Sequence, residues 1–263
     1  MNSEEVGRYW NQNAEVWTRH ARAGYDVYRD ALNTPAFFAM LPEVAGLSGL
    51  DIGCGEGHNT RLLARAGAKV TAIDIAEVFI GHARAAEATD PLGIDYRIAD
   101  GTALPFDDST FDFATAFMSL MDMPEQDKGL AEAARVIRPG GFVQFSILHP
   151  CFVPPTRKTL RRMDGTTRAI EIADYFKRLD GDIDVWKFGG APVDERLKVE
   201  PFRIPRYHRT LSDWVAMIVA AGLSIEAFGE PMASEELAKA VPAVEDTRMA
   251  PIFLHVRARR PAR

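Results

Sequence analysis

The most constraining part of this 263-residue chain is a glycine-rich segment, Gly49-Leu-Asp-Ile-Gly-Cys-Gly-Glu-Gly-His58, which precedes a helical pattern and then Val70-Thr-Ala-Ile-Asp74. This order predicts a buried strand, a glycine turn, a helix and a second strand that ends in a carboxylate. Glycines let the backbone pass close beneath a ligand, and the following helix offers unpaired N–H groups to an anionic group. An acid after the second strand can accept both hydroxyls of a ribose. The segment therefore predicts a nucleotide-binding site.

The spacing of the glycines discriminates between classes of nucleotide. A dinucleotide-binding turn has glycine at its first, third and sixth positions. Counted from Gly53 the sixth position is His58, and counted from Gly55 it is Thr60. Both registers lack the glycine that lets helix and strand pack closely under a pyrophosphate, so the spacing disfavours a dehydrogenase.

The pattern that remains is Asp-x-Gly-x-Gly-x-Gly, formed by Asp51, Gly53, Gly55 and Gly57. Here the chain resembles the class I S-adenosylmethionine (SAM) dependent methyltransferases, and within them the bacterial type-11 group of small-molecule enzymes. The resemblance covers residues 48–149 by motif and 210–258 by topology. It implies SAM as the cofactor, S-adenosylhomocysteine as its product, and no metal.

Strand and helix patterns alternate from Leu50 onward. We expect strands at residues 50–53, 69–74, 96–99, 111–117 and 142–148. We expect the helices between them at 58–66, 79–87 and 125–137, and the pattern resumes with a helix at 212–221 and strands at 223–228 and 252–258. This alternation predicts an α/β fold with a doubly wound, mostly parallel sheet. The resemblance implies a Rossmann-like sheet of seven strands, with the last strand antiparallel.

Two segments lie outside this pattern. Residues 1–46 read as amphipathic helices with many aromatic side chains, and we interpret them as a lid over the cofactor, although their spacing is also typical of plain helix packing. Residues 150–209 are far longer than a usual connection, and we expect this insertion to cover the substrate. The SAM-binding domain is then formed by residues 47–149 and 210–263.

The resemblance assigns cofactor contacts to residues that follow the predicted strands, where open α/β sheets bind ligands. Gly53 and Gly55 are expected beside the methionine part of SAM. Asp74 is expected at the ribose hydroxyls, with Ile75 against the adenine. Asp51 is equally expected to contact the cofactor or to hold the glycine turn.

Further contacts are expected from three more places in the chain. Asp100 and Gly101 are expected at the adenine amino group and ring, although Asp-Gly is also a common turn. Met118 leaves the fourth strand as either a cofactor contact or a core residue. Tyr28 and Arg29 are placed to reach the carboxylate of SAM.

Methyl transfer needs little acid–base help, because the sulfonium already activates the methyl group and the protein mainly aligns the reactants. A hydroxyl or amine acceptor still has to lose a proton. His149 is the first candidate for the base, since it follows the fifth strand; a turn before Pro150 is the alternative. His208 and Asp122 are the other candidates for the base, and either can instead lie at the start of the helix that follows it.

The insertion supplies the expected substrate contacts, Tyr175 and Tyr207. It also differs in charge from the rest of the chain. Its 13 basic and 9 acidic residues give a net charge of +4, which leaves −10 elsewhere. The basic residues Arg157, Lys158, Arg161 and Arg162 can attract an anionic acceptor, although a solvated surface is the more common explanation.

Composition excludes several function classes. The net charge of −6 disfavours a general nucleic-acid binder. Cys54 and Cys151 lack metal-ligand spacing and indicate a reducing cytoplasm. The polar N-terminus does not resemble a signal peptide, and no apolar run reaches the roughly 18 residues that span a membrane. We therefore expect a cytoplasmic enzyme with a small-molecule acceptor and no nucleic-acid or membrane partner.

Two alternatives stay open. The protein can be an RNA or protein methyltransferase, although its acidic balance argues against RNA. It can also bind SAM without transferring a methyl group, since no base is certain. Motifs of serine hydrolases, phosphate-binding loops and zinc proteases are absent from the sequence.

Overall fold

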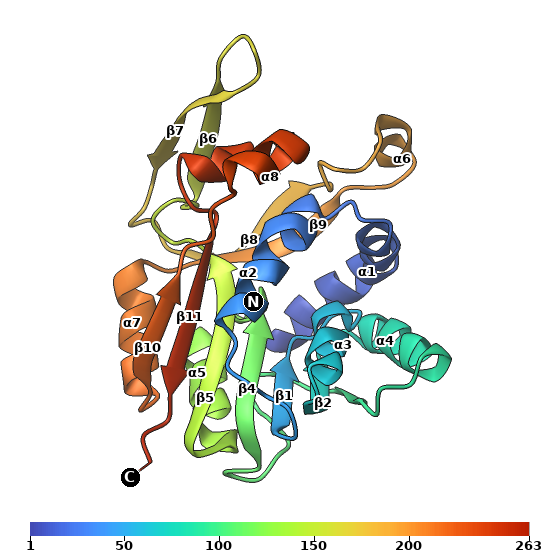
Figure 1. Cartoon of the computed structure of the whole chain (residues 1–263), viewed down its shortest axis with the longest axis vertical. Helices are drawn as coiled ribbons and strands as arrows, with labels where there is room; N and C mark the ends of the chain where they lie inside the picture. Colours follow the sequence, from blue (N-terminus) through green and yellow to red (C-terminus); the bar gives the residue numbers. More distant parts are fainter. Residues whose placement is uncertain (263) are drawn as a thin grey trace.

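The computed structural model describes residues 1–262 and contains a central seven-stranded sheet (Figure 1). Its strands are β1 (Ser48–Ile52), β2 (Lys69–Asp74), β3 (Asp95–Ile98), β4 (Phe111–Phe117), β5 (Ile137–Leu148), β10 (Ser224–Gly229) and β11 (Phe253–Arg259), in the order β10-β11-β5-β4-β1-β2-β3. The five strands β1 to β5 pair in parallel, and β11 runs antiparallel to both of its neighbours. This arrangement confirms the predicted doubly wound fold.

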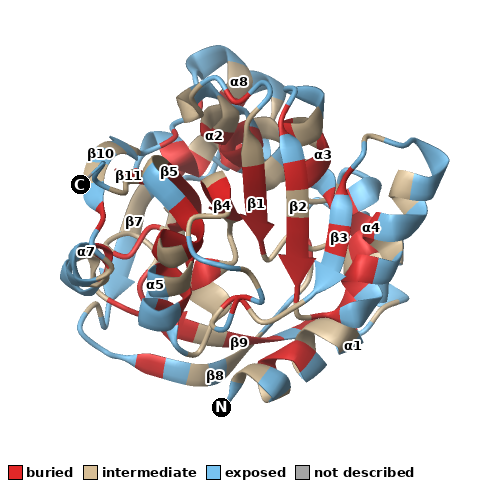
Figure 2. Ribbon diagram, turned by 90° about the horizontal axis from the view of Figure 1, so that it is seen from below, coloured by how far each residue is buried: buried red, intermediate tan, exposed pale blue. Residues whose placement is uncertain are grey.

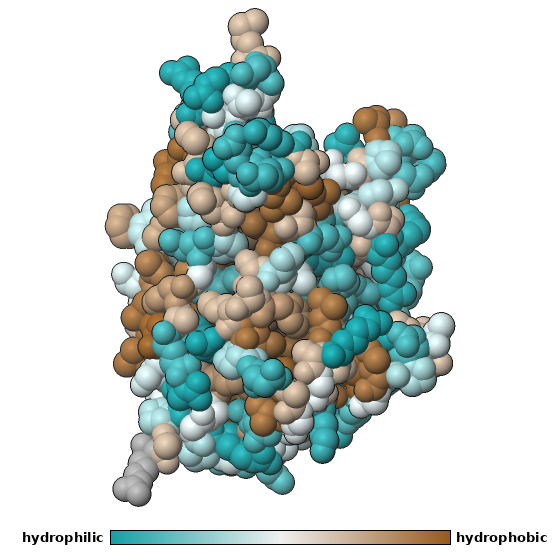
Figure 3. All heavy atoms as spheres, in the orientation of Figure 1, coloured by the Kyte–Doolittle hydropathy of each residue, from teal (hydrophilic) through white to brown (hydrophobic). Residues whose placement is uncertain are grey.

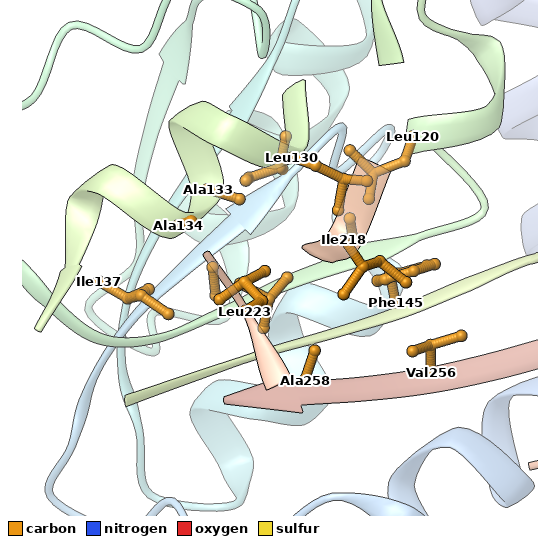
Figure 4. Close-up of a cluster of buried hydrophobic side chains, with 14 of the residues drawn as sticks. Leu120, Leu130, Ala133, Ala134, Ile137, Phe145, Ile218, Leu223, Val256 and Ala258 are labelled. Atoms are coloured by element: carbon orange, nitrogen blue, oxygen red, sulfur yellow. The ribbon is translucent and has the colours of Figure 1, made fainter. Parts of the chain in front are cut away.

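Helices cover both faces of the sheet, so its central strands are buried on both sides (Figure 2). The helices are α3 (His58–Arg65), α4 (Glu77–Thr89), α5 (Gln126–Val136) and α7 (Leu211–Ala220). On one face, Leu130 of α5 and Ile218 of α7 pack on Phe145 and Val256 (Figure 4). On the other, α3 and α4 belong to a second apolar cluster with Phe113. Strands buried on both faces explain the nearly continuous apolar runs in the sequence.

The predicted boundaries agree with the structure to within about two residues, except at β5. That strand begins at Ile137, five residues before the predicted start, because Ile137 already pairs with Phe111. A register shift follows, and regular pairing resumes with Phe142 opposite Phe113.

The N-terminal segment forms α1 (Ser3–Arg22), a π-helical turn (Arg29–Asn33) and α2 (Thr34–Met40). Helix α1 begins with a capping box between Asn2 and Glu5 and packs against α4 and the insertion strand β9. Gly7 lets α1 lie close to Ile75, which follows β2, because a Cβ added at Gly7 would lie 3.1 Å from the Ile75 side chain.

The insertion contains two β-hairpins, whose strands the sequence analysis did not identify. β6 (Thr156–Arg161) pairs with β7 (Thr167–Ala173), and β8 (Leu179–Trp186) pairs with β9 (Phe202–His208) around the short helix α6 (Val193–Leu197). The β6–β7 hairpin projects from the body of the molecule (Figures 1 and 3). The helix α8 (Glu235–Ala240) and a 3-10 helix (Pro242–Arg248) were also not predicted, and they lie between β10 and β11. Within residues 1–262, no helix is long and apolar enough to cross a membrane.

Candidate active site

A cavity of about 790 Å³ lies at the carboxyl ends of β1, β2 and β4. The glycine turn, the residues that follow β2, β3 and β4, the N-terminal segment and the insertion all contribute to its wall. Ligands of open α/β sheets bind at this edge.

The glycine turn after β1 is held tightly on one side and open on the other. The backbone N–H groups of Gly53 and Cys54 both donate to the carbonyl of Ile73, at 2.8 and 2.9 Å. Gly53 has a φ of +72°, and a Cβ added there would lie 2.3 Å from the Cβ of Ser119. A Cβ added at Gly55 would meet no atom within 4 Å. Gly55 therefore leaves free space where a ligand can approach the backbone.

Asp74 ends β2 at this turn, as the sequence predicted. It is 9% exposed, and its carboxylate accepts hydrogen bonds from the N–H groups of Gly55 and Ala76, each at 2.8 Å. Burial raises the pKa of this carboxyl to about 6, against the effect of these hydrogen bonds. Each oxygen keeps a further lone pair, so Asp74 can fix the turn and still accept the hydroxyls of a ribose.

Asp51 braces the site from within β1. It is 2% exposed, and its two oxygens accept hydrogen bonds from the hydroxyls of Thr60 and Thr115, at 2.6 and 2.8 Å. These bonds tie α3 and β4 to β1. Both oxygens of Asp51 are therefore used to hold neighbouring elements in place. This agrees better with a structural role than with direct cofactor contact, although the partners are threonine hydroxyls and not the glycine turn.

The residues after β3 form another part of the wall. One carboxylate oxygen of Asp100 accepts from both the N–H and the hydroxyl of Thr102, each at 2.8 Å. Asp100 thus holds a turn with one oxygen, and its other oxygen can still accept a hydrogen bond from a ligand. A Cβ added at Gly101 would lie 2.5 Å from the Met123 methyl group. Ile75 lines the same cavity.

Met118 follows β4 with a φ of +55°. Its N–H donates to the carbonyl of Ser146 at 2.9 Å, and its sulfur lies 3.4 Å from the Ser146 hydroxyl. Met118 lines the cavity, so its position is compatible with the predicted cofactor contact.

Tyr28 also lines the cavity, but its hydroxyl donates to Asp246 at 2.9 Å. Asp246 in turn pairs with Arg157 of β6 at 3.1 Å. Arg29 pairs with Asp30 at 2.7 Å. The Tyr28 hydroxyl thus links the N-terminal segment to the 3-10 helix Pro242–Arg248. Tyr28 and Arg29 both line the cavity, so their contact with the SAM carboxylate stays a prediction.

His149 does not face the cavity, so the prediction that it lies in the active site as the base is wrong. Its side chain is buried, with Nε2 2.8 Å from Glu230 and with Nδ1 accepting from the N–H of Cys151 at 3.2 Å. The preceding residue, Leu148, is the one that lines the cavity. Because side chains alternate along a strand, His149 points to the opposite side.

His208 and the two predicted substrate tyrosines also lie outside this cavity. Nε2 of His208 contacts the carbonyl of Tyr175 at 2.8 Å, and the Tyr175 hydroxyl accepts from the N–H of Leu211 at 3.0 Å. Burial lowers the pKa of His208. Tyr207 and His208 line a neighbouring pocket of about 30 Å³. The sequence did not show the pairing of β8 with β9, which decides where Tyr207 and His208 lie relative to the main cavity.

Asp122 is the one predicted catalytic residue that lines the main cavity. It ends the 3-10 turn Leu120–Asp122 after β4. Burial raises its pKa well above the usual range, Arg206 lowers it and Asp184 raises it. Arg206 is itself held by Asp184 at 3.3 Å and by two backbone carbonyls. The site thus contains a carboxyl group that holds a proton more readily than an ordinary aspartate.

The insertion brings an aromatic wall and several basic residues to the cavity. Arg157 and Arg161, which the sequence offered for an anionic acceptor, line the cavity. No role was predicted for Trp186, Phe188, Lys187 and Arg206, which line it as well. The alternation in Asp182-Ile-Asp-Val-Trp186 is a strand signal that identifies β8. Across the described residues 1–262, no group of three or more His, Cys, Asp or Glu side chains is arranged to hold a metal ion.

Comparison with known proteins agrees with this geometry. A family model described as a methyltransferase domain matches residues 50–145. A demethylmenaquinone methyltransferase of Clavibacter sepedonicus is 35% identical over 189 residues, which are 72% of this chain and 71% of that protein. A malonyl-[acyl-carrier protein] O-methyltransferase of Pectobacterium atrosepticum is 32% identical over 146 residues, 55% of this chain and 56% of the relative. The chain thus spans little more than half the length of the latter.

Solved structures extend the likeness over more of the chain. An S-adenosylmethionine dependent methyltransferase from Mesorhizobium loti has a TM-score of 0.68 at 28% identity, covering 86% of this chain and 96% of that one. The [4+2]-cyclase SpnF shares the fold, with a TM-score of 0.65 at 18% identity, and covers 100% of this chain and 97% of that one. The chain belongs to the class I SAM-dependent methyltransferases.

Proposed function

We propose that this protein transfers the methyl group of SAM to an oxygen or nitrogen atom of a small-molecule acceptor. The observation that carries the proposal is the continuity of the cavity, which runs from the glycine turn and Asp74 to the wall of the insertion. One cavity can therefore hold a nucleotide at the sheet edge and an acceptor beside it.

The residues at the sheet edge suit the parts of SAM. Gly53 and Gly55 would lie beside the methionine part, Asp74 would accept the ribose hydroxyls, and Asp100 with Ile75 would hold the adenine. The bound cofactor would supply a methyl group already activated on a sulfonium. The protein then has to align the acceptor and exclude water.

Asp122 is the group that we propose to receive the acceptor's proton. SAM, when bound, would supply the methyl group, and its sulfur would keep the electron pair of the broken carbon–sulfur bond. The acceptor's proton passes to the Asp122 carboxylate. Burial raises the pKa of Asp122, which makes its carboxylate a stronger base than that of an ordinary aspartate.

Residues 1–46 and 150–209 would together close the site. The Asn13 side chain of α1 exchanges two hydrogen bonds with the backbone of Arg203 in β9, at 2.9 and 3.3 Å. Trp17 of α1 packs against Phe188 and Phe202 of the insertion, at ring distances of 4.8 and 5.0 Å. These contacts support a cover built from both segments.

The names of the relatives support small acceptors, since they specify a quinone precursor and an acyl group on a carrier protein. The two cysteines are free thiols, which supports the proposed reducing cytoplasm. SpnF supports the second candidate, a SAM-fold protein without methyl transfer, because its name gives a cyclase.

Incubation of the protein with methyl-labelled SAM and a panel of metabolites tests the proposal. We expect label in a small product and S-adenosylhomocysteine in equal amount. Tight S-adenosylhomocysteine binding without transfer to any acceptor would favour the second candidate. Transfer to tRNA or to a protein would favour the nucleic-acid or protein alternative.

A further inference from the structure

The insertion gives the acceptor half of the cavity a positive wall. Its charged residues that line the cavity are the cations Arg157, Arg161, Lys187 and Arg206 and the carboxylate Asp184. The acidic residues of the cofactor half, such as Asp74 and Asp100, lie at the sheet edge instead. The basic balance of residues 150–209 is thus directed partly into the cavity rather than only toward solvent.

Two of these cations already have acidic partners. Arg206 pairs with Asp184 at 3.3 Å, and Arg157 pairs with Asp246 at 3.1 Å. Lys187 donates to the carbonyl of Arg196. Arg161 donates to the carbonyl of Gly165 at 3.0 Å, and among residues 1–262 it has no acidic partner within ion-pair distance. Its positive charge is therefore uncompensated.

Arg157 and Arg161 belong to the same strand, β6, and the charges of both influence the same residue of the cavity wall, Tyr28. Burial raises the pKa of the Tyr28 phenol, and the positive charges of both arginines lower it. Both guanidinium groups are therefore within electrostatic reach of this phenol, which lines the cavity. The Nε of Arg157 is buried and finds no hydrogen-bond partner among the described residues. Its two other guanidinium nitrogens donate to Thr159 and Asp246, each at 3.1 Å, so Arg157 contributes its charge to this wall.

The same cavity also has aromatic side chains in its wall. Trp17, Trp186 and Phe188 all line it, and the ring of Trp17 lies 5.4 Å from that of Trp186 in an edge-to-face arrangement. Such rings present large apolar areas to a ligand. The cavity thus combines an apolar aromatic surface with a cationic one.

We propose that the acceptor is a carboxylic acid with an apolar aromatic body, held at its carboxylate by Arg161 beside the charge of Arg157 and at its body by the aromatic rings of Trp186 and Phe188. This inference rests on the proposed function and names its substrate class. An arginine fork suits the two oxygens of a carboxylate. Removal of a partly exposed charge-assisted hydrogen bond of this kind lowers affinity by about tenfold.

The test compares 2-naphthoate with 2-naphthamide, which share a flat body and differ in charge. Calorimetry first measures S-adenosylhomocysteine binding and then adds each probe to the saturated protein. We expect naphthoate to bind at least about tenfold more tightly than naphthamide and to quench tryptophan fluorescence. The substitution Arg161→Gln should remove this preference and leave S-adenosylhomocysteine binding unchanged.

Arg162→Gln is the matched control. It removes the same charge from the same hairpin, but Arg162 is not among the residues that line the cavity, so the preference should persist. Equal binding of the two probes, or a preference that survives in Arg161→Gln, would overturn the inference while S-adenosylhomocysteine binding upholds the cofactor site. Failure of S-adenosylhomocysteine itself to bind would instead overturn the proposed function.

Discussion

Replacement of Asp74 by alanine should weaken cofactor binding without unfolding the protein. The change removes the carboxylate that can accept the ribose hydroxyls and that accepts the N–H groups of Gly55 and Ala76 at 2.8 Å. Loss of one charge-assisted hydrogen bond costs about 1.5–3 kcal/mol, so the Kd for S-adenosylhomocysteine should rise by about 10- to 150-fold. Isothermal calorimetry measures this change directly.

The role of Asp74 can also be tested through pH, because folding stability and cofactor affinity should change in opposite directions as this carboxyl group ionises. The folded pKa of Asp74 is raised from 3.8 to about 6, so the fold favours the protonated carboxyl. The stability that this group contributes is fully present below pH 3.8 and is lost as the pH rises through about 6. Cofactor affinity should change the other way, because the hydroxyls donate to the ionised form. The affinity should be roughly tenfold lower at pH 5 than at pH 7.5.

Asp95→Ala is the matched control. Asp95 begins the neighbouring strand β3 and forms a half-exposed ion pair with Arg97 at 2.6 Å, and it does not line the cavity. The control should bind S-adenosylhomocysteine as the unmodified protein does. Full affinity in folded Asp74→Ala, or equal affinity of the unmodified protein at pH 5 and pH 7.5, would show that Asp74 does not hold the ribose.

Three further predictions follow from the site. Asp122→Asn should lower methyl-transfer turnover at least about 100-fold with little change in S-adenosylhomocysteine affinity. His149→Ala should keep most of the turnover. If His149→Ala lost more turnover than Asp122→Asn, the histidine would be the base. Gly55→Ala should cost only about 1–2 kcal/mol of stability in a urea titration, for a side chain at positive φ, yet should abolish detectable cofactor binding, because the new methyl group enters the cavity; normal binding would show that no ligand approaches there. Bound S-adenosylhomocysteine should slow hydrogen exchange in residues 1–46 and 150–209, and protection confined to the glycine turn would argue against a cover formed by these segments.

The sheet was predictable because its signals are local. The apolar runs that become β2 and β4 have the bounds expected from the sequence, and Asp74 lies where the strand–turn–helix order requires it. Each of these features depends on neighbours within a few residues and on the general rule that parallel strands are buried on both faces.

The acceptor side was not predictable to the same degree, because it depends on contacts between distant segments. Trp17 of α1 and Trp186 of β8 meet only when the insertion folds back over the N-terminal helix. The direction of the His149 side chain depends on the register of β5 against β11, in which Leu148 pairs with Phe253. A sequence shows that a histidine follows a strand, and the three-dimensional register decides which face it occupies.

A crystal structure with bound S-adenosylhomocysteine would show whether the cofactor occupies the glycine turn. We expect ribose hydroxyls within hydrogen-bond distance of Asp74, the homocysteine part along Gly53 and Gly55, and the sulfur facing the space between Met118 and Asp122. A nucleotide bound elsewhere, or a sulfur directed away from the insertion wall, would contradict this expectation.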